Sequence, residues 1–302
     1  MNIRARHAIA AALCSAAMAI AAPLAAQDQA PKEPDNEIVV EGEIDVDRGD
    51  ARDQTRDITP RPTSAQEPLA RFNKEICPGV WGLAPENAQI VIDRIYDNAE
   101  KIGVPVNDAP DCGANVWVIV VDDPHETFKQ LRDKNDFLVR GMGYWERERI
   151  EKQDGAALSW NLVSTRSRGG LEAVQGANSD AVNETTLMSR TNTAIRQDIE
   201  LSVVLVRRSE LATVDALTLA DYATMRGLAK TEEPNESLAF DTVLGAFGPA
   251  RDVTRLSVFD LSYLRALYRS SPTRDARLAL TDVERLMEEE YARMEAERTE
   301  QR

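Results

Sequence analysis

The sequence predicts an α+β domain in which helices cover a small mixed sheet, followed by a helical C-terminal third. Two short apolar runs predict the central strands, one at 115–121 (NVWVIVV) and one at 198–207 (DIELSVVLVR). Runs of this length that are rich in β-branched residues are typical of strands buried on both faces. From residue 218 onward the apolar spacing is helical instead, so a group of helices follows the strands.

Local signals place the other elements around these two strands. Pro85 predicts the start of a helix over 86–102, and Gly103 ends it. Ser257 with Asp260, and Thr281 with Glu284, have the spacing of capping boxes. The remaining expectations are a turn at 77–80, a helix or loop at 136–154, a strand at 156–165, a loop at 166–183, and helices at 218–229, 241–247, 258–268 and 281–302.

The N-terminus has the pattern of an export signal over residues 1–26. Arg4 and Arg6 precede an apolar stretch at 8–22, and small residues lead to an expected cleavage after Ala26. An uncleaved anchor is the alternative, but about 15 apolar residues are fewer than the roughly 20 that span a bilayer. We therefore expect an exported protein, periplasmic or secreted, that does not span the membrane after cleavage.

Export changes the expected chemistry of the cysteines. Only Cys77 and Cys112 follow the leader, 35 residues apart. An even number of cysteines in an oxidising compartment favours one disulfide. By the chain-entropy model, closing this loop would stabilise the fold by about 3 to 4 kcal/mol.

Composition divides the rest of the chain. Residues 27–66 hold eleven acidic and five basic residues, four prolines and no aromatic residue, which predicts a disordered acidic linker. We expect the α+β globular domain at 67–275 and a charged amphipathic helix at 276–302, which packs on the domain rather than forming a dimer. Within the linker, Asn36–Glu43 (NEIVVEGE) resembles the short segment of TonB-dependent receptors that pairs with a partner's sheet edge; a chance β-prone patch is the alternative.

The charge balance excludes several partners. The formal net charge is −15, and removing Arg4 and Arg6 with the leader makes it −17. An acidic protein repels phosphate backbones and anionic headgroups, so we expect no nucleic-acid partner.

One cluster of possible catalytic residues follows the first central strand. Asp122 and Asp123 stand beside His125, the only histidine after the leader. The alternative is a helix start, with Asp123 as the N-cap and Pro124 and Glu126 in the first turn. A lone histidine cannot supply a two-histidine metal site, so we expect no metal and no cofactor.

A second candidate lies in the helical part. The order of LADYATMRGLA at 219–229, DTVLGAF at 241–247, LSVFD at 256–260 and YLRALY at 263–268 resembles uncharacterised secreted proteins of sphingomonad type. More distantly it is similar to a family of unknown function related to zincin metalloproteases. That resemblance implies a zincin-like scaffold in which Ala220 and Thr224 replace the histidines and Asp221 replaces the glutamate. It also implies a groove for an extended peptide. The alternative is that this helix simply packs the core.

The sequence thus favours a non-catalytic binding or interaction module of the cell envelope, with an envelope protein or peptide as its partner. The alternative function is a divergent peptidase or other hydrolase on a zincin-like scaffold, for which Asp221, Asp122, Asp123 and His125 are the candidate residues. The sequence does not specify an oligomeric state.

Overall fold

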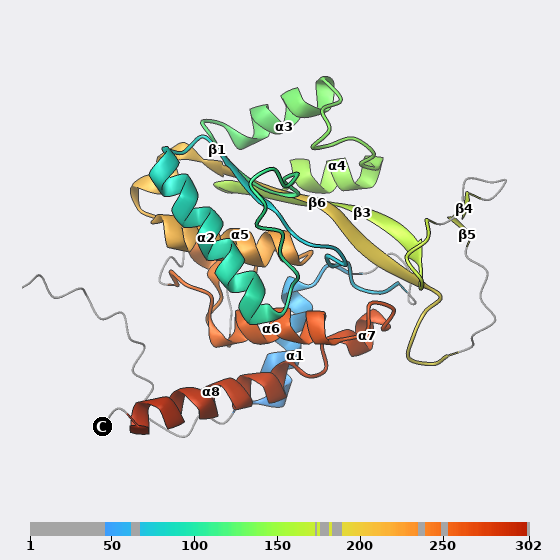
Figure 1. Cartoon of the computed structure of the whole chain (residues 1–302), viewed down its shortest axis with the longest axis vertical. Coiled ribbons are helices and arrows are strands. Elements are labelled where there is room, and N and C mark those ends of the chain that lie inside the picture. Colours follow the sequence, from blue (N-terminus) through green and yellow to red (C-terminus); the bar gives the residue numbers. More distant parts are fainter. Residues whose placement is uncertain are drawn as a thin grey trace, which may run out of the picture. The chain divides into compact units, whose positions relative to one another are not determined.

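The chain folds into an α+β domain, seen in a computed structural model that describes residues 46–61, 67–172, 174–175, 181–182, 189–234, 239–248 and 253–300 (Figure 1). The expected leader (1–26) and the Asn36–Glu43 patch lie outside the described residues. The elements are α1 (Arg48–Ile58), β1 (Pro78–Trp81), α2 (Pro85–Ile102), β2 (Val116–Val121), α3 (Pro124–Asp133), α4 (Tyr144–Glu151), β3 (Ala157–Ser167), β4 (Val174–Gln175), β5 (Ala181–Val182), β6 (Ile195–Arg207), the 3₁₀ turn η1 (Arg208–Ala212), α5 (Ala216–Leu228), the 3₁₀ turn η2 (Val243–Phe247), α6 (Val258–Arg269), α7 (Ala276–Ala279) and α8 (Val283–Glu300).

The main sheet is mixed and has the strand order β1-β2-β6-β3. β1, β2 and β6 are parallel, and α2 forms the connection between the first two. β3 pairs antiparallel with β6 and lies at the sheet's edge. β4 and β5 form a separate two-stranded ribbon within the expected loop at 166–183.

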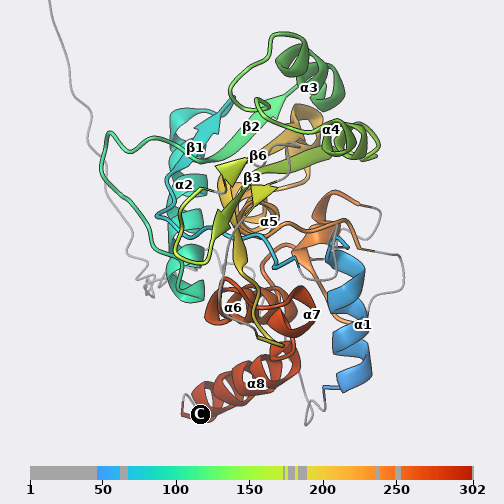
Figure 2. The same ribbon diagram turned by 90° about the vertical axis from the view of Figure 1, so that its right-hand side faces the viewer.

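Both faces of the sheet are covered, as the apolar runs predict. Val116, Val118 and Val120 of β2 belong to one core cluster with α2, α5 and α6, whereas Ile119 belongs to a second cluster with α3 and α4. This is the period of two by which successive strand residues face opposite sides. Figures 1 and 2 show α3 and α4 on one side of the sheet and α2 and α5 on the other, with α6, α7 and α8 beyond them.

The expected linker at 27–66 contains a helix, α1, which corrects that prediction for residues 46–61. Asp47 caps α1 by accepting from Asp50 N, and Val46, Ala51 and Ile58 are buried in the main core. Composition hid this helix because most of its residues are charged, and Ala51 and Ile58 are the apolar residues that it buries. α1 lies beside α8 (Figure 2), so the domain extends beyond residues 67–275 on both sides.

α8 packs on α6 with Val283, Leu286 and Met287 buried. Its Glu290 accepts from Arg265 of α6 at 2.6 Å. This agrees with a C-terminal helix that docks on its own domain.

The structure also corrects the turn expected at 77–80, which is strand β1. Pro78 can begin an edge strand because its missing N–H leaves no ladder bond unmade. The strands at 115–121 and 198–207, the helix after Pro85 and the capping box of Ser257 with Asp260 are confirmed. Cys77 and Cys112 form the expected disulfide.

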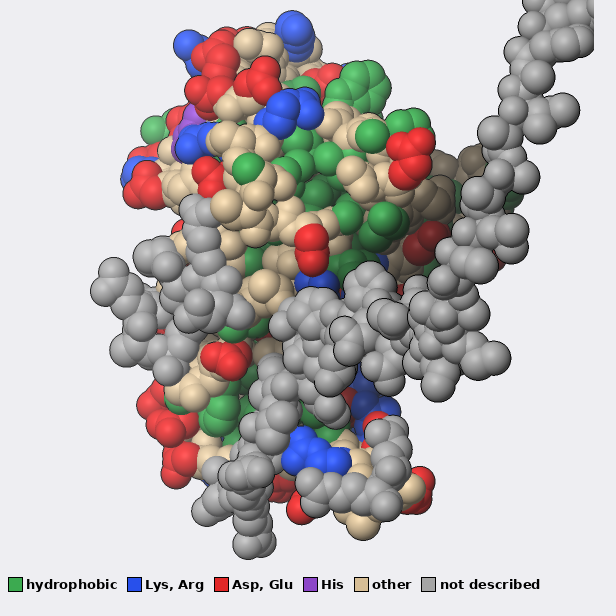
Figure 3. All heavy atoms as spheres, turned by 90° about the vertical axis from the view of Figure 1, so that its left-hand side faces the viewer, with side chains coloured by type: hydrophobic (Ala, Val, Ile, Leu, Met, Phe, Trp, Pro, Cys, Tyr) green, Lys and Arg blue, Asp and Glu red, His purple; other side chains and the backbone are tan. Residues whose placement is uncertain are grey.

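The surface carries charge without one dominant patch on the face seen in Figure 3, where acidic side chains are spread from top to bottom. None of the helices in the described part of the chain is both long and apolar enough to cross a bilayer.

A bulge in β6 holds one strongly perturbed carboxylate. Leu162 pairs with Leu201 and Val163 with Ile199, so Glu200 is the extra residue. Its carboxylate accepts from Lys74 at 2.5 Å, Ser164 at 2.6 Å and Arg166 at 2.7 Å. Partial burial opposes ionisation, but these three donors outweigh it and lower the pKa of Glu200 to about 2.

We expect Glu200 to stabilise the fold above about pH 5 and to lose this effect as the pH falls toward 2. Its pKa is lowered from 4.5 in the unfolded chain, so acid favours unfolding. In thermal melts, wild type should exceed Glu200→Gln at pH 7, and the gap should shrink in acid. Glu288→Gln, on the exposed side of α8, is the control. A gap between wild type and Glu200→Gln that stays constant from pH 7 to 3 would contradict this account.

Candidate functional site

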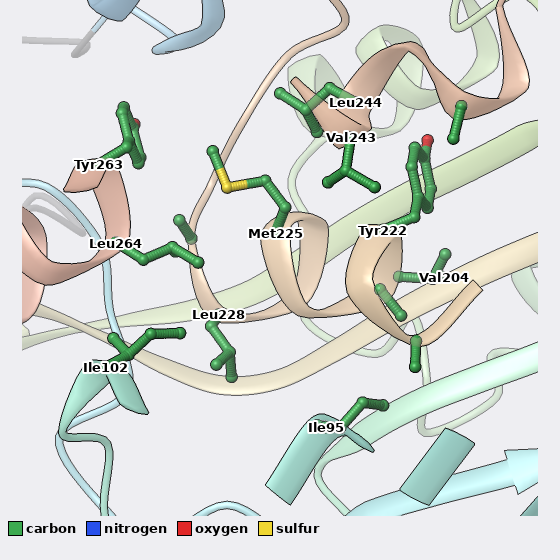
Figure 4. Packing of buried hydrophobic residues seen from close by; sticks show 14 of the residues in the cluster. Ile95, Ile102, Val204, Tyr222, Met225, Leu228, Val243, Leu244, Tyr263 and Leu264 are labelled. Carbon is green, nitrogen blue, oxygen red and sulfur yellow. The ribbon is translucent and has the colours of Figure 1, made fainter. Parts of the chain in front are cut away.

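α5, the helix for which the sequence analysis raised a zincin-like role, is buried on all sides of its middle turns. Tyr222, Met225 and Leu228 point into the core against η2, α6 and α2, as Figure 4 shows. Ala220, Asp221 and Thr224 are each fully buried. At Gly227 an added Cβ would lie 3.2 Å from Ser202 Oγ, so the helix lies directly against the sheet.

The side chain of Asp221 is engaged in a buried ion pair. Arg94 of α2 donates to its two carboxylate oxygens at 2.7 and 2.9 Å. Asn98 Nδ2 and the backbone N–H of Leu256 donate at 2.6 and 3.1 Å. The hydrogen bond to Asp221 raises the pKa of Arg94 above its ordinary value. Asp221 therefore connects α2, α5 and the segment before α6.

Ala220 and Thr224, which stand at the positions that the resemblance assigns to metal-binding histidines, are buried in the core. Thr224 Oγ1 donates to Ala220 O at 2.8 Å and accepts from Asn98 at 3.1 Å. Within the described ranges no three His, Cys, Asp or Glu side chains are grouped to hold a metal. α5 offers no open surface at which a substrate could meet Asp221.

The residues after β2 do not form a cluster with Asp221. Asp123 caps α3 by accepting from the N–H groups of His125 and Glu126, which lowers the pKa of its carboxyl. Asp122 is 91% exposed and pairs with Arg208 at 3.1 Å. His125 Nε2 lies 2.9 Å from the carbonyl oxygen of Gln153. These contacts are those of a helix start and its surroundings.

The structure instead reveals a groove around the end of α1, which sequence reasoning missed. Three adjoining hollows all include Arg61, and two of them also share Pro60 and Leu69. The groove is built by residues from α1, β3, α6, α7 and α8, which are far apart in the chain. No local motif could have indicated it, because only the tertiary fold brings these segments together.

One wall of the groove is the outer edge of β3. Arg71 N donates to Gln197 O at 3.2 Å and Ile199 N donates to Arg71 O at 2.9 Å, so these groups of β6 face away from β3. The backbone groups of Asp198, the residue between them, face β3, where Asp198 is paired with Ser164 in the ladder. Backbone groups alternate in direction along a strand. The N–H and C=O groups of the neighbouring odd-numbered residues in β3 therefore point outward.

This outer edge is closed at both ends. At one end the side-chain amide of Gln153 makes the two hydrogen bonds that a neighbouring strand would make. Its Oε1 accepts from Ser159 N at 3.0 Å and its Nε2 donates to Ser159 O at 2.9 Å. At the other end Ser167 N donates to Leu171 O at 2.8 Å. Between these ends, no described residue hydrogen-bonds to the outward backbone groups of Asn161 and Val163.

A cleft of about 270 Å³ lies directly beside this open stretch. Val163 and Thr165 line it from β3, and Tyr263 and Leu267 from α6. Lys230 and Glu146, paired at 3.2 Å, form part of its wall. The open backbone groups of β3 can therefore hydrogen-bond to the backbone of an extended ligand, and the cleft can accept one of its side chains.

We expect the Arg94–Asp221 pair to be structural. Arg94→Ala would leave a fully buried carboxylate without its cation and should lower the free energy of unfolding by about 3 to 5 kcal/mol. Arg285→Ala removes an arginine from an exposed pair and should cost less than about 1 kcal/mol. Urea unfolding followed by circular dichroism measures both, and equal losses would refute the assignment.

No protein-family model, no curated protein and no solved structure matches this chain.

Proposed function

We propose that this chain is an exported, non-catalytic binding module that takes up an extended segment of an envelope protein or peptide along the outer edge of β3. The open backbone groups of Asn161 and Val163 carry this proposal. An added strand would satisfy them by main-chain hydrogen bonds, the usual mode of β-augmentation. The Cys77–Cys112 disulfide is compatible with export.

The dimensions of the edge limit the ligand. At about 3.4 Å per residue, the open stretch between the two closed ends accepts roughly five residues. Main-chain bonds supply affinity that depends little on sequence, whereas the cleft beside Val163 and Thr165 selects one side chain. A hydrolase on this scaffold would need a site other than α5, whose candidate residues are buried.

The test removes one outward N–H from the edge. Val163→Pro deletes this donor at an edge position where proline is tolerated, while Val163→Ala retains it. Peptides enriched from a displayed library of random dodecapeptides should bind wild type and Val163→Ala alike. Their dissociation constants should rise at least tenfold, about 1.4 kcal/mol, in Val163→Pro.

Circular dichroism verifies that each variant remains folded. Methylating alternate backbone nitrogens of an enriched peptide should weaken it similarly, because the bond is then removed from the partner's side. Failure to enrich any peptide, or equal binding by folded Val163→Pro, would overturn the proposal.

A further inference from the structure

The largest hollow in the groove is separate from the β3 edge and has a different chemistry. It has a volume of about 480 Å³ and lies between α1, α7 and α8. Its walls are mainly apolar, with Ala51, Leu69, Ala276, Leu280 and Val283 contributing. A hollow of this size falls within the range that small-molecule ligands occupy in proteins.

Four of the residues that line this pocket are exposed arginines. Arg52 and Arg56 lie one turn apart on the same side of α1, and Arg61 and Arg277 complete the set. Asp53 and Asp57 of α1 line the adjoining hollow of about 420 Å³, which Arg56 and Arg61 also line. Neither of these two carboxylates lines the larger pocket, which Arg52, Arg56 and Arg61 border.

Two of these arginines are available for a ligand. Arg277 is held by Asp275 at 3.0 and 2.7 Å, and Arg56 lies 3.2 Å from the highly exposed Asp53. Arg52 and Arg61 form no ion pair with any residue in the described ranges. Among the described residues of the lining Glu284 is the one acidic residue, and Arg48 already neutralises it at 2.7 Å.

This arrangement is unusual for a chain with a net charge of −15. Unpaired guanidinium groups favour carboxylates, which they can bind through two parallel hydrogen bonds. The apolar walls favour a hydrocarbon body below the head group. From the exposed arginines and the apolar residues of its lining, we infer that the pocket between α1, α7 and α8 binds an amphiphile with a medium-length acyl chain and a carboxylate head.

Decanoate is the probe, with isothermal titration calorimetry as the measurement. Wild type should bind it saturably at one site. Acetate, which has the head without the chain, and decyltrimethylammonium, which has the chain with the opposite charge, should each bind at least tenfold more weakly. Saturable binding of acetate equal to that of decanoate would reduce the site to a simple anion site and overturn the inference.

Two variants locate the binding in this pocket. The double change Arg52→Gln with Arg61→Gln should weaken decanoate at least tenfold, and Ala276→Phe should abolish binding by filling the pocket. Arg140→Gln removes a cation from an exposed loop and should change the affinity less than twofold. Thermal melts confirm that each variant is folded. Wild-type affinity in the folded Ala276→Phe protein, or no saturable binding by wild type, would refute the inference.

Discussion

The hydrogen bonds to the buried carboxylate of Asp221 hold α2, α5 and the start of α6 together. The carboxylate accepts from α2, through Arg94 and Asn98, and from the backbone just before α6. A buried charge is tolerated only when partners replace the water it loses. These partners fix the position of α5 against both neighbours, and Gly227 lets the same helix approach the sheet closely. α5 thereby covers β2, β6 and β3 on one face of the sheet.

The groove follows from that arrangement. α6 is placed by its contacts with α5 and α2, and α8 packs on α6. α1 then docks beside α8, with Arg48 of α1 paired to Glu284. Among the described residues no strand lies beyond the outer edge of β3, and the groove lies between this edge and the helices. Each hollow in it is thus bounded by elements that the Asp221 network positions indirectly.

The sequence specified the centre of the fold better than its margins. The apolar runs in β2 and β6 are mostly buried, with helices on both faces of the sheet, as expected for runs of this kind. α1 escaped notice because its docking needs only Val46, Ala51 and Ile58 within a highly charged stretch. Asp221 was marked through a resemblance, but its partner Arg94 lies 127 residues away in the chain. No local sequence pattern indicates that pairing. The walls of the groove likewise come from segments that are far apart in the chain.

The amide of Gln153 has a consequence for association between copies of the chain. A free sheet edge invites pairing with another edge, and long open edges lead to growing stacks of strands. Here a side chain occupies the edge at Ser159 and the chain itself occupies it at Ser167. The remaining gap is shorter than β3 itself, which has 11 residues, so two folded copies cannot align their β3 strands along their full length. The edge can receive a short guest without becoming the start of a fibre.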